Sequence, residues 1–173
     1  MKIFGLVGWS GSGKTTLMRG LLPTLTERGL NVSTIKHTHH NFDIDKPGKD
    51  SYMHREAGAH EVLITGARRW AILHENRDHT EPDMDSLLAR MEEVDLVLVE
   101  GFKSYSHRKL EVFRPSVGKP MIAMDDETIV AVASDEKFDA PGVPLLNLND
   151  INEIACFIVG FCDLEIRSAD GAA

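Results

Sequence analysis

The chain has few cysteines, no long apolar run and no excess of positive charge. Cys156 and Cys162 lie six residues apart in a predicted helix, about 9 Å along its axis, which is too far for a disulfide. We expect both to be buried thiols, which suits a reducing compartment. No apolar segment approaches the roughly 20 residues of a membrane span, and the first residues lack the basic and apolar regions of an export signal. We therefore expect a cytoplasmic protein without a membrane partner.

Positive charges are outnumbered, with 19 Lys and Arg residues against 27 Asp and Glu residues. The net charge of −8 argues against a nucleic-acid partner, because a broad nucleic-acid surface needs clustered Lys and Arg to displace counterions. At 173 residues, with 42% hydrophobic and 27% charged residues, the chain has the size and composition of one soluble globular domain. It contains no internal repeat or low-complexity segment. We expect a single domain over residues 1–165 and a flexible tail over residues 166–173.

A glycine-rich segment, Gly8-Trp9-Ser10-Gly11-Ser12-Gly13-Lys14-Thr15, fits the pattern G-x-x-x-x-G-K-[ST]. It lies between an apolar run at residues 3–7 and a helical pattern that follows it, which is the context in which this pattern binds phosphate. Glycines let successive backbone N–H groups turn toward an anion. Lys14 then reaches the β- and γ-phosphates, and the Thr15 hydroxyl is the expected Mg²⁺ ligand. The segment predicts a phosphate loop that binds a nucleoside triphosphate.

Hydrophobic periodicity predicts alternating strands and helices. The first 35 residues form a strand–helix–strand pattern, which implies a parallel sheet with a right-handed crossover. Residues 94–101 are apolar on both faces and are expected in the middle of a covered sheet. We expect an α/β protein with the three-layer P-loop NTPase fold, in which a mainly parallel sheet carries helices on both faces. Strands are predicted at residues 3–7, 31–35, 61–65, 70–73, 94–101, 110–113, 121–123, 128–133 and 145–148, and helices at residues 16–29, 51–59, 82–91 and 151–159.

An acid follows the central apolar strand. Four apolar residues precede Glu100, which matches the Walker-B pattern. In an open parallel sheet the ligand crevice lies beyond the carboxyl ends of the strands, so Glu100 is expected to face the phosphate loop directly or through a Mg²⁺-bound water. Asp95 lies at the other end of the strand, about 16 Å away at roughly 3.3 Å per residue. We therefore predict catalytic roles for Lys14 and Glu100.

The polar segment from Lys36 to Ser51 is unusually long for a connection within a compact domain, and such loops are usually functional or disordered. Its histidines raise the hypothesis of a metal site, but structural zinc sites usually add cysteine ligands, and neither cysteine is near in sequence. Its lysines suit phosphate or polyanion recognition better, and a merely solvated loop is the third interpretation. One of the three aspartates in this segment, Asp43, Asp45 or Asp50, is expected to complete the Mg²⁺ shell, and the residues alone do not say which. The residues concerned are Lys36, His37, His39, His40, Asp43, Asp45, Lys46, Lys49 and Asp50.

The sequence says less about which base is bound and about hydrolysis than about phosphate binding. The chain has no Asn-Lys-x-Asp segment, and the carboxylates that could accept the guanine N1–H and N2–H₂ groups are Asp135 and Asp150, each after a predicted strand. Asp150 is better placed to cap the helix that follows it. No residue is placed to orient an attacking water as a switch glutamine does, so we expect slow hydrolysis at most.

Four segments together resemble one protein family. They are the phosphate loop through Thr16, Ile35-Lys36-His37-Thr38-His39-His40, Asp45-Lys46-Pro47-Gly48-Lys49-Asp50-Ser51, and Leu98-Val99-Glu100-Gly101-Phe102-Lys103. In order and spacing they resemble the molybdopterin-guanine dinucleotide biosynthesis protein B family, from residue 3 to about residue 160. Through its acid-ended central strand the chain also resembles, more distantly, the P-loop GTPases and related ATPases that work as dimers.

The family resemblance implies a GTP-binding accessory protein of molybdenum cofactor maturation, which assists the guanylyltransferase that attaches GMP to molybdopterin. It implies a homodimer, Mg²⁺ and weak intrinsic GTPase activity, with molybdopterin or its guanine dinucleotide as a further ligand. It places the nucleotide at Gly8, Trp9, Ser10, Gly11, Ser12, Gly13, Lys14, Thr15 and Thr16. It places a crevice for the pterin or the partner at Lys36, His37, His39, His40, Lys46, Lys49 and Asp50. The expected Mg²⁺ ligands are Thr15, Asp50 and Glu100.

Two other classes of function also fit a phosphate loop followed by a His- and Lys-rich segment. A small-molecule kinase or ligase would use the His- and Lys-rich segment to orient an acceptor for γ-phosphoryl transfer, and it predicts turnover stimulated by a substrate. A metal-insertion GTPase would use the histidines as a metal relay, and it predicts stoichiometric metal binding that is abolished by His39→Ala or His40→Ala.

Overall fold

The computed structural model describes residues 1–38, 42–78, 80–138 and 142–167. The chain divides into two compact units, one formed by Met1–His37 with Glu92–Ala173 and the other by Thr38–Met91. The expectation of one domain over residues 1–165 stays a prediction. Of the expected tail, residues 168–173 lie outside the described residues. None of the described helices combines the length and the apolar character needed to cross a bilayer.

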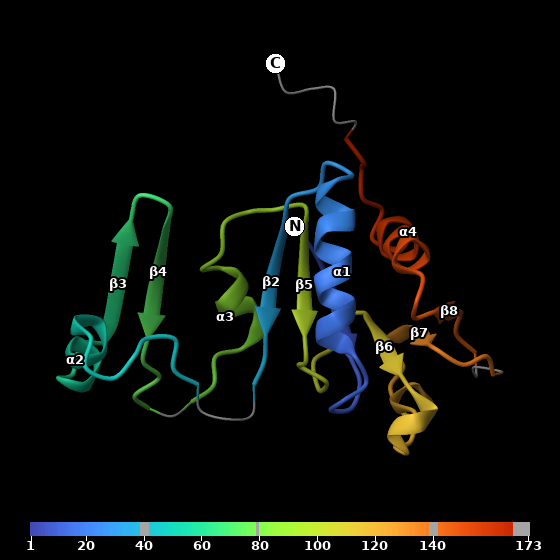
Figure 1. Cartoon of the computed structure of the whole chain (residues 1–173), viewed down its shortest axis with the longest axis horizontal. Helices are drawn as coiled ribbons and strands as arrows, with labels where there is room; N and C mark the ends of the chain where they lie inside the picture. The colour runs from blue at the N-terminus through green and yellow to red at the C-terminus, as the bar shows by residue number, and fades with distance from the viewer. Residues whose placement is uncertain (39–41, 79, 139–141, 168–173) are drawn as a thin grey trace. The chain divides into compact units, whose positions relative to one another are not determined.

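The first unit is built on a six-stranded sheet in which all neighbouring strands are parallel (Figure 1). Its elements are β1 (Lys2–Val7), α1 (Lys14–Thr26), β2 (Val32–Lys36), β5 (Leu96–Glu100), β6 (Lys109–Phe113), η1 (Pro115–Val117), η2 (Ile122–Met124), β7 (Ile129–Ser134), β8 (Leu145–Asn147) and α4 (Ile151–Phe161). The strand order is β2-β5-β1-β6-β7-β8. The predicted α/β class with a mainly parallel sheet of the P-loop type is confirmed, and β5 lies inside the sheet, between β1 and β2, as expected for an all-apolar strand.

One face of this sheet packs against α1 and α4, which also contact each other. Alternate residues of β1, Phe4 and Leu6, are fully buried there together with Leu17, Leu21 and Ile154. This matches the alternation of a strand with the three-to-four spacing of a helix. The packing fixes the beginning of α1 next to the end of β1, which sets the position of the segment between them.

Two predictions are wrong in this unit. Residues 121–123 do not form a strand; they overlap the 3₁₀ helix η2. The backbone N–H groups of Ile122 and Ala123 donate to the fully buried Glu111 carboxylate at 2.9 and 2.8 Å, so a side chain takes the place of a strand ladder. Cys162 is buried as expected, but Cys156 is exposed, because it lies on the side of α4 opposite to the core residues.

The second unit contains an antiparallel hairpin and two short helices. Its elements are α2 (Asp50–Glu56), β3 (Glu61–Gly66), β4 (Arg69–His74) and α3 (Met84–Leu88). The two strands pair from Glu61 with His74 to Gly66 with Arg69, as the two predicted neighbouring strands require. The guanidinium of Arg55 joins the α2 helix to carboxylates before and after it, namely those of Asp43, Asp45 and Glu75.

Candidate functional site

The segment between β1 and α1 is a loop closed by its own lysine. The Lys14 ammonium donates to the carbonyl oxygens of Gly8 at 3.0 Å and Trp9 at 2.9 Å, so the side chain folds back over the loop. Gly13 precedes α1 with a left-handed backbone, and no side chain caps the helix. The first N–H groups of a helix carry partial positive charge and seek an anion. A loop with this lysine at its centre has the features of a phosphate site.

Gly8 is required at the start of this loop. Its φ is +146°, and a Cβ there would lie 2.4 Å from the carbonyl oxygen of Val112 in the neighbouring strand β6. The same Cβ would lie 2.7 Å from the Ser12 hydroxyl, which is buried and has no hydrogen-bond partner among the described residues. The loop is therefore packed tightly onto the end of β6, and glycine is the one residue that leaves this space open.

Thr15 and Glu100 meet at the carboxyl ends of the strands. The Thr15 hydroxyl donates to the Glu100 carboxylate at 2.9 Å. Glu100 is the last residue of β5, and it lies in register with Leu6 of β1 and Lys36 of β2. A hydroxyl and a carboxylate oxygen side by side are the hard donors that Mg²⁺ prefers. The structure thus brings together two of the three predicted ligands, Thr15 and Glu100, while Asp50 belongs to the second unit.

Three lysines share the electrostatic field of this loop. Burial lowers the pKa of Lys14, and the neighbouring charges of Lys103 and Lys36 lower it further, while the Glu100 carboxylate acts in the opposite direction. Like charges gathered at one place favour a bound anion, because it offsets their mutual repulsion. The field around the loop is therefore suited to a ligand that carries several negative charges.

Aromatic side chains surround the end of β5. Gly101 and Phe102 both have positive φ, +97° and +49°, and this turn is followed by Lys103, whose ammonium lies 4.1 Å from the Trp9 ring centre. The Trp9 indole N–H donates to the Pro120 carbonyl at 2.7 Å. The His37 ring lies 4.3 Å from the Phe102 ring, measured between centroids. Trp9 and His37 thus lie near residues that follow β5, as expected for side chains at the crevice edge.

Sequence reasoning missed Arg114. This residue follows β6 directly, and its Nε donates to the carbonyl oxygen of Ser12 at 3.0 Å. Its other arm forms an ion pair with Asp135, the residue after β7. The position of Arg114 after a predicted strand was the available signal, since it puts the side chain at the same sheet edge as the phosphate loop. Asp150 instead accepts from the Glu153 N–H at 2.9 Å, which confirms its expected role as a helix cap.

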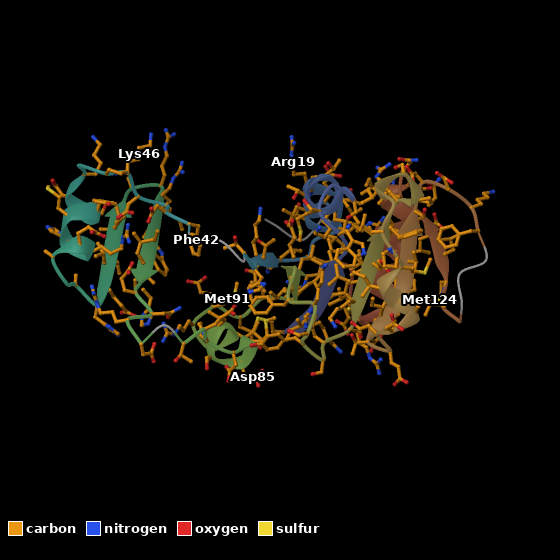
Figure 2. All side chains as sticks on the ribbon, turned by 90° about the horizontal axis from the view of Figure 1, so that it is seen from below. Arg19, Phe42, Lys46, Asp85, Met91 and Met124 are labelled. Carbon is orange, nitrogen blue, oxygen red and sulfur yellow. The ribbon has the colours of Figure 1, made fainter. Side chains whose placement is uncertain are left out.

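The remaining predicted residues belong to the second unit or lie outside the described residues. Lys46, which is labelled in Figure 2, and Lys49 are exposed in the segment before α2, and Asp50 is the first residue of that helix. Their roles toward nucleotide, Mg²⁺ or pterin stay predictions. His39 and His40 are outside the described residues. Among the described residues no three His, Cys, Asp or Glu side chains are grouped so that they could hold a metal ion.

Comparison with known proteins agrees with this geometry. The family model described as "Molybdopterin guanine dinucleotide synthesis protein B" matches residues 3–135. The "Molybdopterin-guanine dinucleotide biosynthesis adapter protein" of Escherichia coli strain K12 is 43% identical over 160 residues, which are 91% of each chain. The protein with the same name from Haemophilus influenzae is 41% identical over 161 residues, 90% of this chain and 86% of its own.

Solved structures give the same result. A crystal structure of molybdopterin-guanine biosynthesis protein B is 29% identical and has a TM-score of 0.74, covering 92% of this chain and 99% of its own. The crystal structure of Bacillus subtilis MobB is 25% identical, also with a TM-score of 0.74, and covers 95% of this chain and 99% of its own. The chain therefore belongs to the molybdopterin guanine dinucleotide synthesis protein B family, MobB.

Proposed function

We propose that the chain is a GTP-binding adapter protein of molybdopterin guanine dinucleotide biosynthesis. The family membership and the names of its relatives support the pathway. The observation that carries the nucleotide site is the closed loop, in which Lys14 spans two loop carbonyls and Thr15 bonds to Glu100 at the adjacent strand end. Both contacts use groups that a phosphate and a hard cation would satisfy equally well.

In the proposed complex the backbone N–H groups from Trp9 to Thr16 hold the phosphate oxygens, and the Lys14 ammonium exchanges its loop carbonyls for the β- and γ-phosphates. Thr15 and Glu100 would hold Mg²⁺, with Asp50 as the further predicted ligand. The ion, when bound, neutralises charge that develops between the β- and γ-phosphates. Lys36 and His37 extend the polar edge on the β2 side, where a pterin or a partner could be recognised.

Hydrolysis is proposed to be weak. Transfer of the γ-phosphoryl group to water needs a residue that orients the water. Glu100 is instead engaged at the loop, where it accepts a hydrogen bond from the Thr15 hydroxyl. Lys14 would stabilise the transferring charge without activating the nucleophile. An adapter that delivers GTP to a guanylyltransferase gains from such slow turnover, because the nucleotide then survives until the partner is met.

The hairpin of the second unit supports a protein partner and a homodimer. Leu63, Trp70 and Ile72 lie on one face of β3 and β4 and are 57%, 62% and 48% exposed. Exposed apolar residues grouped on a two-stranded sheet mark a surface that is usually covered by another chain. We propose a cytoplasmic homodimer that engages the guanylyltransferase and molybdopterin or its guanine dinucleotide.

Substitution of the phosphate-loop lysine tests the nucleotide site. We expect Lys14→Ala to weaken GTP binding at least tenfold, because it removes the cation that faces the phosphates. Lys2→Ala is the matched control, since Lys2 is an exposed lysine at the opposite end of β1. Equal GTP affinity of the Lys14 variant and the control would place the nucleotide elsewhere.

A further inference from the structure

Arg114 connects the phosphate loop with the end of β7. Its Nε donates to the Ser12 carbonyl at 3.0 Å, and its Nη1 pairs with the Asp135 carboxylate. Both side chains are more than two-thirds shielded, with exposed fractions of 31% and 24%. The three groups are more than 20 residues apart in sequence, so no local turn enforces their contact. The guanidinium fork is rigid and planar, which lets one arginine hold both acceptors in fixed directions.

The hydrogen bond to Ser12 decides which way the next peptide unit points. The described peptide bonds are trans, and in a trans unit the carbonyl and the following N–H point in opposite directions. Because the Ser12 carbonyl is turned toward Arg114, the Gly13 N–H is turned away from it. Gly13 directly precedes α1, where an N–H would otherwise lack an acceptor. Arg114 thus occupies the carbonyl side of this peptide and leaves its N–H side available for an anion.

Asp135 keeps the arginine in this position. Without the carboxylate, the guanidinium would be an unpaired cation at the phosphate loop, which also carries Lys14, and it would be free to move toward solvent or toward a bound phosphate. With the ion pair formed, the charge of Arg114 is balanced and its Nε stays on Ser12. One of the two Asp135 oxygens, Oδ2, is therefore already engaged by Arg114, whereas the guanine N1–H and N2–H₂ groups would need both oxygens as acceptors.

We propose that Arg114 and Asp135 form a clamp that orients the Ser12–Gly13 peptide for phosphate binding, and that Asp135 acts through Arg114 and does not read the guanine base. Both are positioning residues, and the ligand they serve is the polyphosphate chain of the nucleotide. The proposal rests on the proposed nucleotide site. It predicts that the clamp contributes equally to any ligand with the same phosphates, whatever its base.

Calorimetric titration of the full chain with GTP, ATP and inorganic tripolyphosphate, all with Mg²⁺, tests this. We expect Arg114→Ala and Asp135→Asn each to weaken the binding of all three ligands by the same factor, about tenfold in Kd, which is 1.4 kcal/mol. Asp135→Asn added to Arg114→Ala should cause no further loss, because residues that act through one contact are not additive. Arg19→Ala, a change of an exposed arginine on α1, is the control and should bind as the wild type does.

Several outcomes overturn the clamp. A loss confined to GTP would make Asp135 a base-reading residue, and additive losses would mean that the two residues act separately. Unchanged binding of tripolyphosphate by the folded variants would remove the orienting role. Thermal melts identify a variant that fails to fold, and Asp135→Asn, which retains one acceptor oxygen, then carries the test alone. A wild-type chain that binds none of the three ligands would instead refute the phosphate site itself, which separates the two failures.

Discussion

Replacement of Gly8 by alanine perturbs the phosphate loop at its tightest point. The φ of +146° is unfavourable for an L-residue, at a cost of about 1–3 kcal/mol. A Cβ at 2.4 Å from the Val112 carbonyl adds a steric term, because that oxygen belongs to the backbone of β6 and cannot turn aside. Overpacking of this kind costs about 1–3 kcal/mol. We expect Gly8→Ala to lower the free energy of unfolding by about 4 kcal/mol in total.

Gly11→Ala is the matched control in the same loop. Its φ of +82° imposes a comparable backbone strain, but a Cβ there meets no atom within 4 Å. The two variants should therefore differ by about 2 kcal/mol, which is the steric term alone. Urea unfolding measures this difference as a shift of roughly 1 M in midpoint at a slope near 2 kcal/mol per M.

The same pair should also differ in nucleotide binding. The clash would push the loop off the end of β6 and spread the N–H groups that face the phosphates, so Gly8→Ala should lose GTP affinity more strongly than Gly11→Ala. Equal midpoints for the two variants would refute the close approach of Gly8 to Val112, and with it the packing that holds the loop.

Two further predictions concern stability outside the loop. Burial lowers the pKa of His107 to about 4, so the unfolded chain takes up a proton there at a higher pH than the folded one, and wild-type stability should fall as the pH decreases from about 6.5 to about 4. Urea unfolding across this range should show a smaller fall for His107→Leu than for the exposed control His54→Leu, and equal falls would contradict the burial effect. Arg55→Ala leaves the carboxylate of Asp45, whose side chain is 3% exposed, without its ion-pair partner. Hydrogen exchange in β3 and β4 should therefore be faster than in the control variant Arg68→Ala, which changes an exposed arginine at the hairpin turn. Unchanged exchange would mean that the ion pairs of Arg55 do not stabilise this unit.

The sequence was most informative where function and local pattern coincide. The phosphate loop, its lysine and the acid after the central strand occupy contiguous motifs, and the structure places Lys14, Thr15 and Glu100 at one sheet edge. The all-apolar run of β5 predicted an interior strand, because both of its faces had to be covered, and β5 lies between β1 and β2. These features follow from periodicity and from the carboxyl-edge rule.

Other features depend on contacts between distant segments. Arg114 and Pro120 reach the loop from more than 100 residues away, and neither carries a motif. Residues 121–123 were wrongly predicted as a strand because they are apolar, but the backbone N–H groups of Ile122 and Ala123 donate to the buried Glu111 carboxylate instead of to a neighbouring strand. Cys156 was expected to be a buried thiol because it lies too far from Cys162 for a disulfide, but its exposure depends on which face of α4 meets the sheet.

The most direct measurement is calorimetric titration of the wild-type chain with GTP and with ATP, each with and without Mg²⁺, with product analysis on the same samples. We expect GTP to bind more tightly than ATP, Mg²⁺ to strengthen the binding, and turnover to stay below about one per minute, far under the usual range of enzymes. Preferential binding of ATP, or rapid turnover, would contradict the GTP-binding adapter and would favour a phosphoryl-transfer enzyme instead.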